Sequence, residues 1–322
     1  MNPKLTCIIC FKNEGNWIET TVKSIRESTE DVEILLINDC SDDGFNYGEV
    51  AERYGCRYLC NDQTLGVAGS RDLGVKNCET PYFILLDGHM KFPERDWDKR
   101  IIGALDTHPK SIVITNTIVM FLPRKSNTIR NLDCKDKRYT AFGAYINFNE
   151  PWNGLQSIWS RKPPKEGEEL MEIPSVLGAT YASSVEWWNY IGGLHGLISY
   201  GEDESLMSIK TWLFGGKCYI IPYLGIAHLY RVSKPYESDR VDHTYNKMFL
   251  TDLFIDDPEL HDDMIKKISN TIKKDLYKDL MSLREKQLSS VLELKKFIKE
   301  RQVIDFNYYR DNINKPFLDY KK

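Results

Sequence analysis

The chain has 322 residues, of which 42% are hydrophobic, and a formal net charge of −4. This length is sufficient to bury a large core, and the ordinary apolar content excludes disorder along the whole chain. The slightly acidic balance gives no whole-chain electrostatic footprint for nucleic acid, and no apolar stretch reaches the length of a membrane span.

The N-terminus enters a strand pattern at Leu5 with no basic and apolar leader before it, and the eight cysteines show no paired regular spacing. Cys7 and Cys10 have CxxC spacing, but in a strand these positions point to opposite faces, which favours core packing over a redox or zinc role. We therefore expect a cytoplasmic protein with reduced cysteines.

The first part of the chain alternates strand and helix signals. Apolar runs typical of strands lie at 5–10, 32–38, 82–86 and 111–121. Helical patterns lie between them, at 17–27, 67–77 and 97–105. This alternation predicts an α/β fold with a mostly parallel sheet covered by helices on both faces.

Two polar segments follow. Residues 147–171 are aromatic, proline-rich and charged, and are expected to contain an exposed loop, and a further α/β stretch runs to Leu229. Residues 231–246 are polar and carry Pro235, which predicts a long surface loop. Loops of this length are often mobile lids when they border a site.

After Pro258 apolar residues recur at three- and four-residue steps, as in an amphipathic helix. The stripe contains Ile265, Ile268, Ile272, Leu276, Leu280, Leu283, Val291, Leu294 and Ile298. Lysines and acids alternate on the other faces. This pattern favours a helical extension packed on the preceding domain or on a twin subunit, rather than a nucleic-acid patch.

Asp87-Gly88-His89 ends the apolar run 82–86, and His228 follows far downstream. Residues i and i+2 of a strand share a face, so Asp87 and His89 can bind one ion together. Carboxylate and imidazole suit a divalent metal of the manganese type. By itself, the tripeptide is as typical of a turn as of a metal site. A histidine taken alone, such as His228, is more typical of a core residue than of a metal ligand.

Further motifs occur in a fixed order along the chain. They are Asn13-Glu14, Asn38-Asp39, the helix start at Gly66 to Arg71, Asp87-Gly88-His89, Gly201-Glu202-Asp203-Glu204 ahead of Trp212 and Gly215-Gly216, and His228-Leu229-Tyr230-Arg231. This order resembles the GT-A glycosyltransferases, most closely the polypeptide N-acetylgalactosaminyltransferase family, with the broader family-2 transferases behind it. The resemblance covers about residues 4 to 250.

The resemblance implies a metal-dependent UDP-sugar site. In that family a DxH motif and a later histidine hold Mn²⁺, or Mg²⁺ in its place, on the donor diphosphate. Asp87, His89 and His228 match these ligands. The metal would neutralise charge on the departing UDP.

The same resemblance assigns the donor pocket. Asp39 matches a carboxylate directed at the uridine, and Arg71 a basic residue near the phosphates. Asn13 and Glu14 match a strand-end pair that shapes the nucleotide pocket, and Gly88 and Arg231, within the DxH and HxxR motifs, belong to the same pocket. From the residues alone, Asp39 is equally suited to cap a helix and Arg71 to form a surface ion pair.

The acidic cluster Glu202, Asp203 and Glu204 is the expected catalytic group on the sugar and acceptor side. Asp203 aligns with a family Glu, and Glu204 with a family Asn. The DxH and second histidine favour retention of the anomeric configuration. An inverting, family-2-type reaction with Asp203 as general base is the alternative. A solvated acidic helix start is the non-catalytic interpretation.

We therefore expect a retaining hexosyl- or N-acetylhexosaminyltransferase that uses a UDP-sugar. Its catalytic domain would span 1–250, with a lid at 231–246, and a helical extension would span 251–322. The acceptor is a glycan, a protein or a hydroxylated DNA base, and the helices are a possible route to a homo-oligomer. A nucleotidyltransferase and a non-catalytic nucleotide-sugar binding module are the rival functions.

Overall fold

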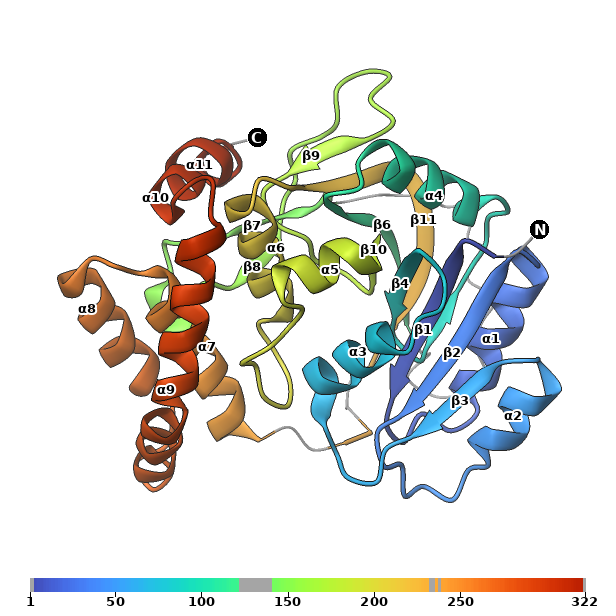
Figure 1. The fold of residues 1–322 in the computed structure, drawn as a ribbon, viewed down its shortest axis with the longest axis horizontal. Coiled ribbons are helices and arrows are strands. Elements are labelled where there is room, and N and C mark those ends of the chain that lie inside the picture. Colours follow the sequence, from blue (N-terminus) through green and yellow to red (C-terminus); the bar gives the residue numbers. More distant parts are fainter. Residues whose placement is uncertain (1–2, 122–140, 232–234, 237–238, 321–322) are drawn as a thin grey trace.

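The computed structural model describes residues 3–121, 141–231, 235–236 and 239–320. Its centre is a mixed sheet with helices on both sides, and the C-terminal helices stand together beside it (Figure 1). The strands of this sheet are β1 (Leu5–Phe11), β2 (Val32–Asn38), β3 (Arg57–Cys60), β4 (Tyr82–Leu86), β5 (Met90–Lys91), β6 (Ser111–Phe121), β9 (Met171–Ile173), β10 (Thr180–Ser184) and β11 (Lys217–Tyr230).

The sheet order is β3-β2-β1-β4-β10-β6-β11-β5, with β9 also paired to β11. Strands β3, β2, β1 and β4 run parallel to one another, as do β6 and β11. Strand β10 runs antiparallel between β4 and β6 and therefore joins two parallel halves. A separate two-stranded sheet contains β7 (Ala144–Ile146) and β8 (Ser157–Trp159).

The helices complete the two outer layers. They are α1 (Trp17–Ser28), α2 (Tyr47–Arg53), α3 (Gly66–Lys76), α4 (Trp97–Thr107), α5 (Val185–Ile191), α6 (Asp203–Leu213), α7 (Arg240–Phe254), α8 (Pro258–Ser269), α9 (Tyr277–Arg301), α10 (Phe306–Tyr308) and α11 (Lys315–Leu318). A 3₁₀ turn, η1, spans Pro151–Asn153, and a π-helical turn, η2, spans Tyr309–Asn314.

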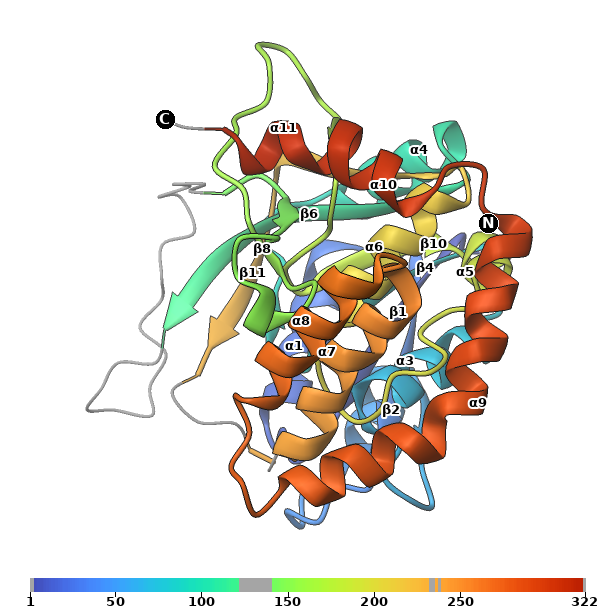
Figure 2. The same cartoon turned by 90° about the vertical axis from the view of Figure 1, so that its left-hand side faces the viewer.

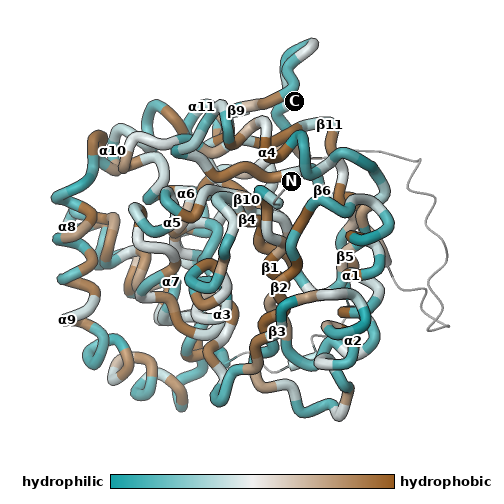
Figure 3. Tube along the Cα trace, turned by 45° about the vertical axis from the view of Figure 1, so that its right-hand side comes forward, coloured by the Kyte–Doolittle hydropathy of each residue, from teal (hydrophilic) through white to brown (hydrophobic). Residues whose placement is uncertain are grey.

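Alternate residues of β1 contribute to two different cores. Leu5, Cys7 and Ile9 pack in one cluster with residues of α1, α2 and α4. Ile8 packs in the other with residues of α3, α5 and α6, and Cys10 lies against that second cluster. The apolar colouring of β1 and β2 between the two helix layers shows the result (Figure 3). Cys7 and Cys10 thus face opposite sides as predicted, and the seven cysteines in the described part of the chain are free thiols.

The predicted fold class is confirmed. The four predicted strands and three predicted helices of the first half coincide with β1, β2, β4, β6, α1, α3 and α4 to within a few residues. The structure adds α2, β3 and the antiparallel strand β10, which the sequence patterns did not indicate.

The predicted long loop at 231–246 is wrong in its second half. Residues 240–246 form the first turns of α7, in which Tyr245 and Asn246 are buried. The side chain of Asp239 caps this helix by accepting a hydrogen bond from the backbone N–H of Val241. The sequence interpretation gave weight to polar composition and missed this cap. Residues 232–234 and 237–238 of the predicted lid lie outside the described residues.

The C-terminal helices α7, α8 and α9 pack against one another beside the sheet (Figure 2). Of the predicted apolar stripe, Ile268, Leu280, Val291, Leu294 and Ile298 are buried in the same core cluster as Ile8 of β1. The stripe is interrupted after α8 ends at Ser269, and resumes in α9. The predicted boundary at residue 250 lies inside α7, and the division into two domains stays a prediction.

Among the described residues, no helix combines the length and the apolar character that a membrane crossing requires.

Candidate metal centre

The three predicted metal ligands converge where β4 ends, β5 begins and β11 approaches its end. Asp87 directly follows β4, and His89 lies just before β5. Strand β5 pairs antiparallel with β11 so that Met90 lies opposite His228, which brings the two histidines together. The Nε2 atom of His228 lies 3.0 Å from Nε2 of His89 and 3.1 Å from Oδ2 of Asp87.

This donor set fits a divalent cation. One ligand atom from each of Asp87, His89 and His228 lies within 4.8 Å of the others, and all three side chains are partly exposed. Two imidazole nitrogens and one carboxylate oxygen leave further coordination positions for phosphate oxygens or water, which suits Mn²⁺ and related first-row ions. The side chains that would hold the ion are therefore in place.

The charge of Asp87 is stabilised by its neighbours. Burial acts to raise the pKa of Asp87, but the hydrogen bond from His228 and the charges of His228, Arg71 and His89 outweigh it and hold the pKa well below its usual range. The Nη2 atom of Arg71 lies 3.3 Å from Oδ1 of Asp87. Asp87 therefore presents an ionised carboxylate between a cationic side chain and the imidazoles.

Arg71 links the metal ligands to the acidic cluster. It lies within α3, is 6% exposed, and pairs through Nη1 with Oδ2 of Asp203 at the start of α6. Its guanidinium also lies 5.0 Å from the ring centroid of Tyr181. The position predicted for Arg71, near the donor phosphates, is compatible with this placement. The alternative interpretation, a surface ion pair, does not fit this placement, because Arg71 and Asp203 are both buried.

The other two acids of the cluster are also placed away from bulk water. Oε1 of Glu204 accepts a hydrogen bond of 2.7 Å from the hydroxyl of Tyr181, and burial, with the charge of Asp203, raises the pKa of Glu204. Glu202 is 6% exposed, and burial raises its pKa to about 7 although the charge of Lys247 acts in the opposite direction. The interpretation of a solvated acidic helix start is therefore wrong for Glu202 and Asp203.

Asp39 acts as a helix cap in this structure. Its carboxylate accepts hydrogen bonds from the backbone N–H groups of Leu65 and Gly66, at 2.7 and 2.9 Å, and from the side chain of Asn61 at 2.8 Å. Gly66 is required there, because a Cβ would lie 2.5 Å from Cα of Ser199. These bonds fix the start of α3, and hence the position of Arg71.

Asn13 and Glu14 have separate roles at the end of β1. Asn13, with a φ of 56°, exchanges hydrogen bonds with Asp42 and so ties the end of β1 to the loop after β2. Glu14 is buried, and its Oε2 accepts from Nδ1 of His89 and from Arg231. Gly88 lies against Glu14. Of the predicted donor-pocket residues, Glu14 thus contacts Gly88, Arg231 and the candidate ligand His89, and Arg71 contacts the candidate ligand Asp87.

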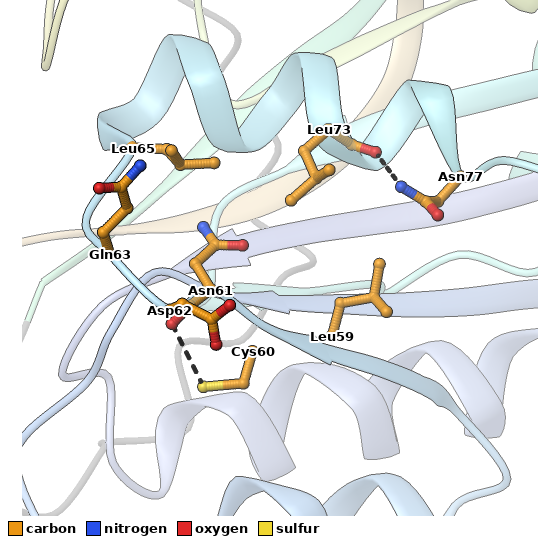
Figure 4. A pocket seen from close by; sticks show the side chains of 8 residues that line it. All are labelled: Leu59, Cys60, Asn61, Asp62, Gln63, Leu65, Leu73 and Asn77. Carbon is orange, nitrogen blue, oxygen red and sulfur yellow. Dashed lines mark hydrogen bonds between the residues drawn. The ribbon is translucent and has the colours of Figure 1, made fainter.

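A separate open pocket of about 500 Å³ lies at the sheet edge between β3 and α3 (Figure 4). Its lining includes Leu59, Leu65, Leu73 and Asn77, and contains none of the predicted site residues. Asn61 and Leu65, which both donate hydrogen bonds to Asp39, connect it to the predicted nucleotide pocket. We therefore place the chemistry at the metal centre and not in this pocket.

Sequence reasoning missed two residues that act on the acidic cluster, Tyr181 and Lys247. Tyr181 lies on β10 just after the small-residue segment at 178–180, so the missed strand concealed it. Lys247 lies on α7, in a helix whose start was interpreted as loop. A helix assignment from Asp239 onward would have indicated that Lys247 projects from a packed element.

Residues 6–156 match the family model described as "Glycosyl transferase family 2". Polypeptide N-acetylgalactosaminyltransferase 4 of Caenorhabditis elegans is 24% identical over 236 residues, which cover 72% of this chain and 39% of that protein. Polypeptide N-acetylgalactosaminyltransferase 11 of Xenopus tropicalis is 21% identical over 333 residues, covering 97% and 50%. The chain thus spans half or less of the length of these curated relatives.

A solved structure, of GalNAc-T7 with UDP, GalNAc and Mn²⁺, superposes with a TM-score of 0.73 at 20% identity, covering 97% of this chain and 56% of that one. Similarity at this level establishes the fold, which is of the GT-A type. With the family model matched over residues 6–156, it confirms the predicted resemblance to glycosyltransferases and the GT-A-like fold.

Proposed function

We propose that the protein transfers a sugar, preferentially an N-acetylhexosamine, from a UDP-sugar to an acceptor hydroxyl with retention of configuration. The observation that carries the proposal is the convergence of Asp87, His89 and His228 within 4.8 Å at the ends of their strands. The GT-A-like fold and the similarity to polypeptide N-acetylgalactosaminyltransferases support the choice of donor.

In the proposed reaction the bond between the anomeric carbon and the β-phosphate oxygen of UDP breaks. A bond from the acceptor oxygen to the same carbon forms, and the acceptor proton passes to the departing phosphate. A divalent ion bound by Asp87, His89 and His228 would supply charge neutralisation on the diphosphate. Arg71 adds a buried cation next to Asp87, where it stabilises negative charge that develops on the leaving group.

The contacts of Asp203 support retention over inversion. Its Oδ2 accepts from Arg71, so this oxygen is already engaged and is not free to remove a proton from an acceptor. Glu204 is likewise engaged by Tyr181. We propose that the two carboxylates orient Arg71 and the donor sugar. An inverting reaction with Asp203 as base is the alternative, and the anomeric configuration of the product separates the two.

The acceptor is proposed as a glycan or a protein, with a hydroxylated DNA base as a further class. The relatives' names favour a polypeptide. A DNA acceptor would make binding weaken steeply with salt, because Lys and Arg contacts to phosphates release counterions. Cytoplasmic location and assembly through the C-terminal helices stay predictions.

Two rival functions are less well supported. A nucleotidyltransferase would be expected to carry a glycine-rich phosphate loop after the first strand, whereas β1 is followed by Lys12, Asn13 and Glu14. A non-catalytic binding module would not need three converging metal ligands, although it does not conflict with them.

The test is the release of free UDP from a panel of UDP-sugars, measured with Mn²⁺ and with EDTA. We expect slow, metal-dependent hydrolysis of one donor by the wild-type chain. Replacement of His228 by Ala should abolish it, because one of three ligand atoms is lost. His195→Ala is the matched control, since His195 is exposed and outside the centre, and it should behave as wild type.

Absence of UDP release from every donor, together with calorimetry that shows no metal-dependent binding of UDP, would refute the proposal. Metal-dependent binding of UDP that persists without turnover on any acceptor would instead identify a binding module.

A further inference from the structure

We propose that Glu14 is a positioning residue of the metal centre. Its carboxylate fixes the tautomer and orientation of His89 and couples that ligand to Arg231. The inference rests on the proposed function, because that function requires a metal ion to which His89 binds. It also changes the role of Glu14 from a residue that shapes the nucleotide pocket to one that acts through a ligand.

The hydrogen bonds of Glu14 determine which nitrogen of His89 faces the site. The side chain of Glu14 is 4% exposed, and its Oε2 lies 3.2 Å from Nδ1 of His89. A carboxylate accepts hydrogen bonds, so the proton of a neutral His89 is on Nδ1. The lone pair is then on Nε2, the nitrogen that lies 3.0 Å from Nε2 of His228 and toward Asp87. Glu14 thus selects the tautomer that a metal requires.

The backbone around Glu14 leaves it little freedom. A Cβ on Gly88 would lie 2.8 Å from Cγ of Glu14, so only glycine at position 88 allows this approach. The carbonyl of Gly88 accepts a hydrogen bond of 2.9 Å from the hydroxyl of Thr21 on α1. The carbonyl of Glu14 accepts from the N–H of Trp17 at the start of the same helix. Both residues are therefore anchored to α1.

The second histidine has no comparable support. Nδ1 of His228 is buried and has no hydrogen-bond partner within the described ranges. Its ring is instead held by packing, with the ring of Tyr230 at 4.7 Å in an edge-to-face arrangement. Of the two imidazoles, only His89 therefore has a hydrogen bond at Nδ1 among the described residues, and the loss of Glu14 should act on it specifically.

Arg231 shares the same carboxylate oxygen. Its Nη2 donates to Oε2 of Glu14, and its guanidinium lies 5.9 Å from the ring centroid of Trp17. Arg231 follows His228 by three residues and stands where β11 ends. Glu14 consequently joins His89, which precedes β5, to the chain that leaves β11. The segments that carry the two histidines are therefore tied together through the Nδ1 side of His89.

The test measures the affinity of the full chain for Mn²⁺ alone, by electron paramagnetic resonance of the free ion. We expect Glu14→Ala to weaken Mn²⁺ binding by about 10- to 100-fold, the effect typical of lost outer hydrogen bonds to metal ligands. Glu14→Gln keeps an acceptor oxygen and should restore most of the affinity. Glu27→Gln, at an exposed glutamate of α1, is the matched control and should bind Mn²⁺ as the wild type does.

A second measurement reads the tautomer of His89 directly in the wild-type chain. Nitrogen-15 NMR of the histidine rings in the metal-free wild type should show His89 as the Nδ1–H tautomer, with its signals assigned by their loss in His89→Gln. In Glu14→Ala the same signals should shift toward a tautomer mixture. A merely structural role of Glu14 would leave the tautomer unchanged.

The inference is overturned if wild-type His89 carries its proton on Nε2, or if folded Glu14→Ala binds Mn²⁺ as tightly as the wild type. If Glu14→Ala does not fold, the wild-type tautomer decides. Failure of the wild type to bind Mn²⁺ would count against the proposed function. In that case the tautomer measurement would still decide whether Glu14 orients His89.

Discussion

Glu202 is a buried acid whose surroundings oppose its charge. It stands directly before α6 with a φ of 68°, a conformation that favours glycine, and its Oε2 has no hydrogen-bond partner in the part of the chain that the structure describes. Burial raises the pKa of Glu202 to about 7, with the charge of Lys247 acting in the opposite direction. At neutral pH this residue is therefore close to its titration point.

We predict that Glu202→Gln changes how stability depends on pH. Between about pH 4.5, where the unfolded chain loses this proton, and pH 7, the folded protein retains it, so wild-type stability falls as pH rises. The variant lacks this loss. Between pH 4.5 and 8, the free energy of unfolding of Glu202→Gln should therefore rise by about 3 kcal/mol relative to that of the wild type. Urea unfolding at both pH values measures it.

Glu166→Gln is the control, because Glu166 is exposed and should show a nearly constant difference from wild type over the same pH range. A constant difference for Glu202→Gln as well would mean that Glu202 titrates as an ordinary surface acid.

At the residue scale the sequence predicted which candidate ligands come together, but not the side chains that support them. Asp87, His89 and His228 followed from a motif and an order of motifs. The hydrogen bond from His89 to Glu14 depends on a side-chain rotamer and on the approach of Gly88, which no sequence pattern encodes. Asp39 illustrates the same difficulty, because capping and ligand binding require the same residue type at the same strand end.

One carboxylate joins three C-terminal helices. Asp252 of α7 accepts hydrogen bonds from Nε and Nη2 of Arg284 on α9, at 2.9 and 2.6 Å, and lies 2.8 Å from Nε2 of His261 on α8. Its side chain is 9% exposed. Because bidentate charged pairs have fixed geometry, this residue sets the mutual orientation of the helices.

We predict that Asp252→Asn lowers the free energy of unfolding by about 2 kcal/mol, because the amide of the new side chain presents a donor to a charged guanidinium in a mostly buried position. Hydrogen exchange should show the loss of protection in α8 and α9. Asp263→Asn removes an exposed pair with Lys267 and should change stability by less than about 0.5 kcal/mol. Equal effects of the two substitutions would contradict the assigned role.

At the element scale, long periodic segments were predictable and short ones were not. The runs that became β1, β2, β4 and β6 are strongly apolar because both faces are covered. Strand β10, with the sequence Thr180 to Ser184, has few apolar residues, and its burial comes from its position between β4 and β6. The start of α7 was not predicted for a similar reason, because its first turn is polar.

The sheet and the C-terminal helices share one core. Residues of α7, α8, α9 and α10 belong to the same buried cluster as Ile8 and Phe83 of the sheet. Phe306 stacks on Phe254 at 5.5 Å between ring centroids. The similarity to known proteins likewise continues past residue 250, because two of the comparisons cover 97% of the chain.

We predict that a chain ending at residue 256 does not fold cooperatively, because it exposes the apolar surface that Leu280, Val291, Leu294 and Ile298 cover. Limited proteolysis and thermal unfolding measure this. Removal of residues 319–322 alone is the control and should leave the unfolding midpoint within about 2 °C. A cooperative transition of the shorter chain at the wild-type temperature would establish the helices as a separate domain.

At the scale of the molecule, composition and the alternation of elements were enough to predict the fold class. They did not predict how strongly the C-terminal helices are integrated. The amphipathic stripe shows that one face is buried, but the same stripe would fit a partner subunit equally well.

The position of β11 couples metal binding to the folding of the chain. His228 is 139 residues away from His89 in sequence, and the two meet only when β11 has joined the sheet beside β5. An ion that binds all three ligands therefore recognises the assembled fold and not its parts. By mass action, an ion present at 100 times its dissociation constant would add about 2.7 kcal/mol to the stability of the whole. The supply of the metal would then affect the stability of the folded protein as well as its proposed turnover.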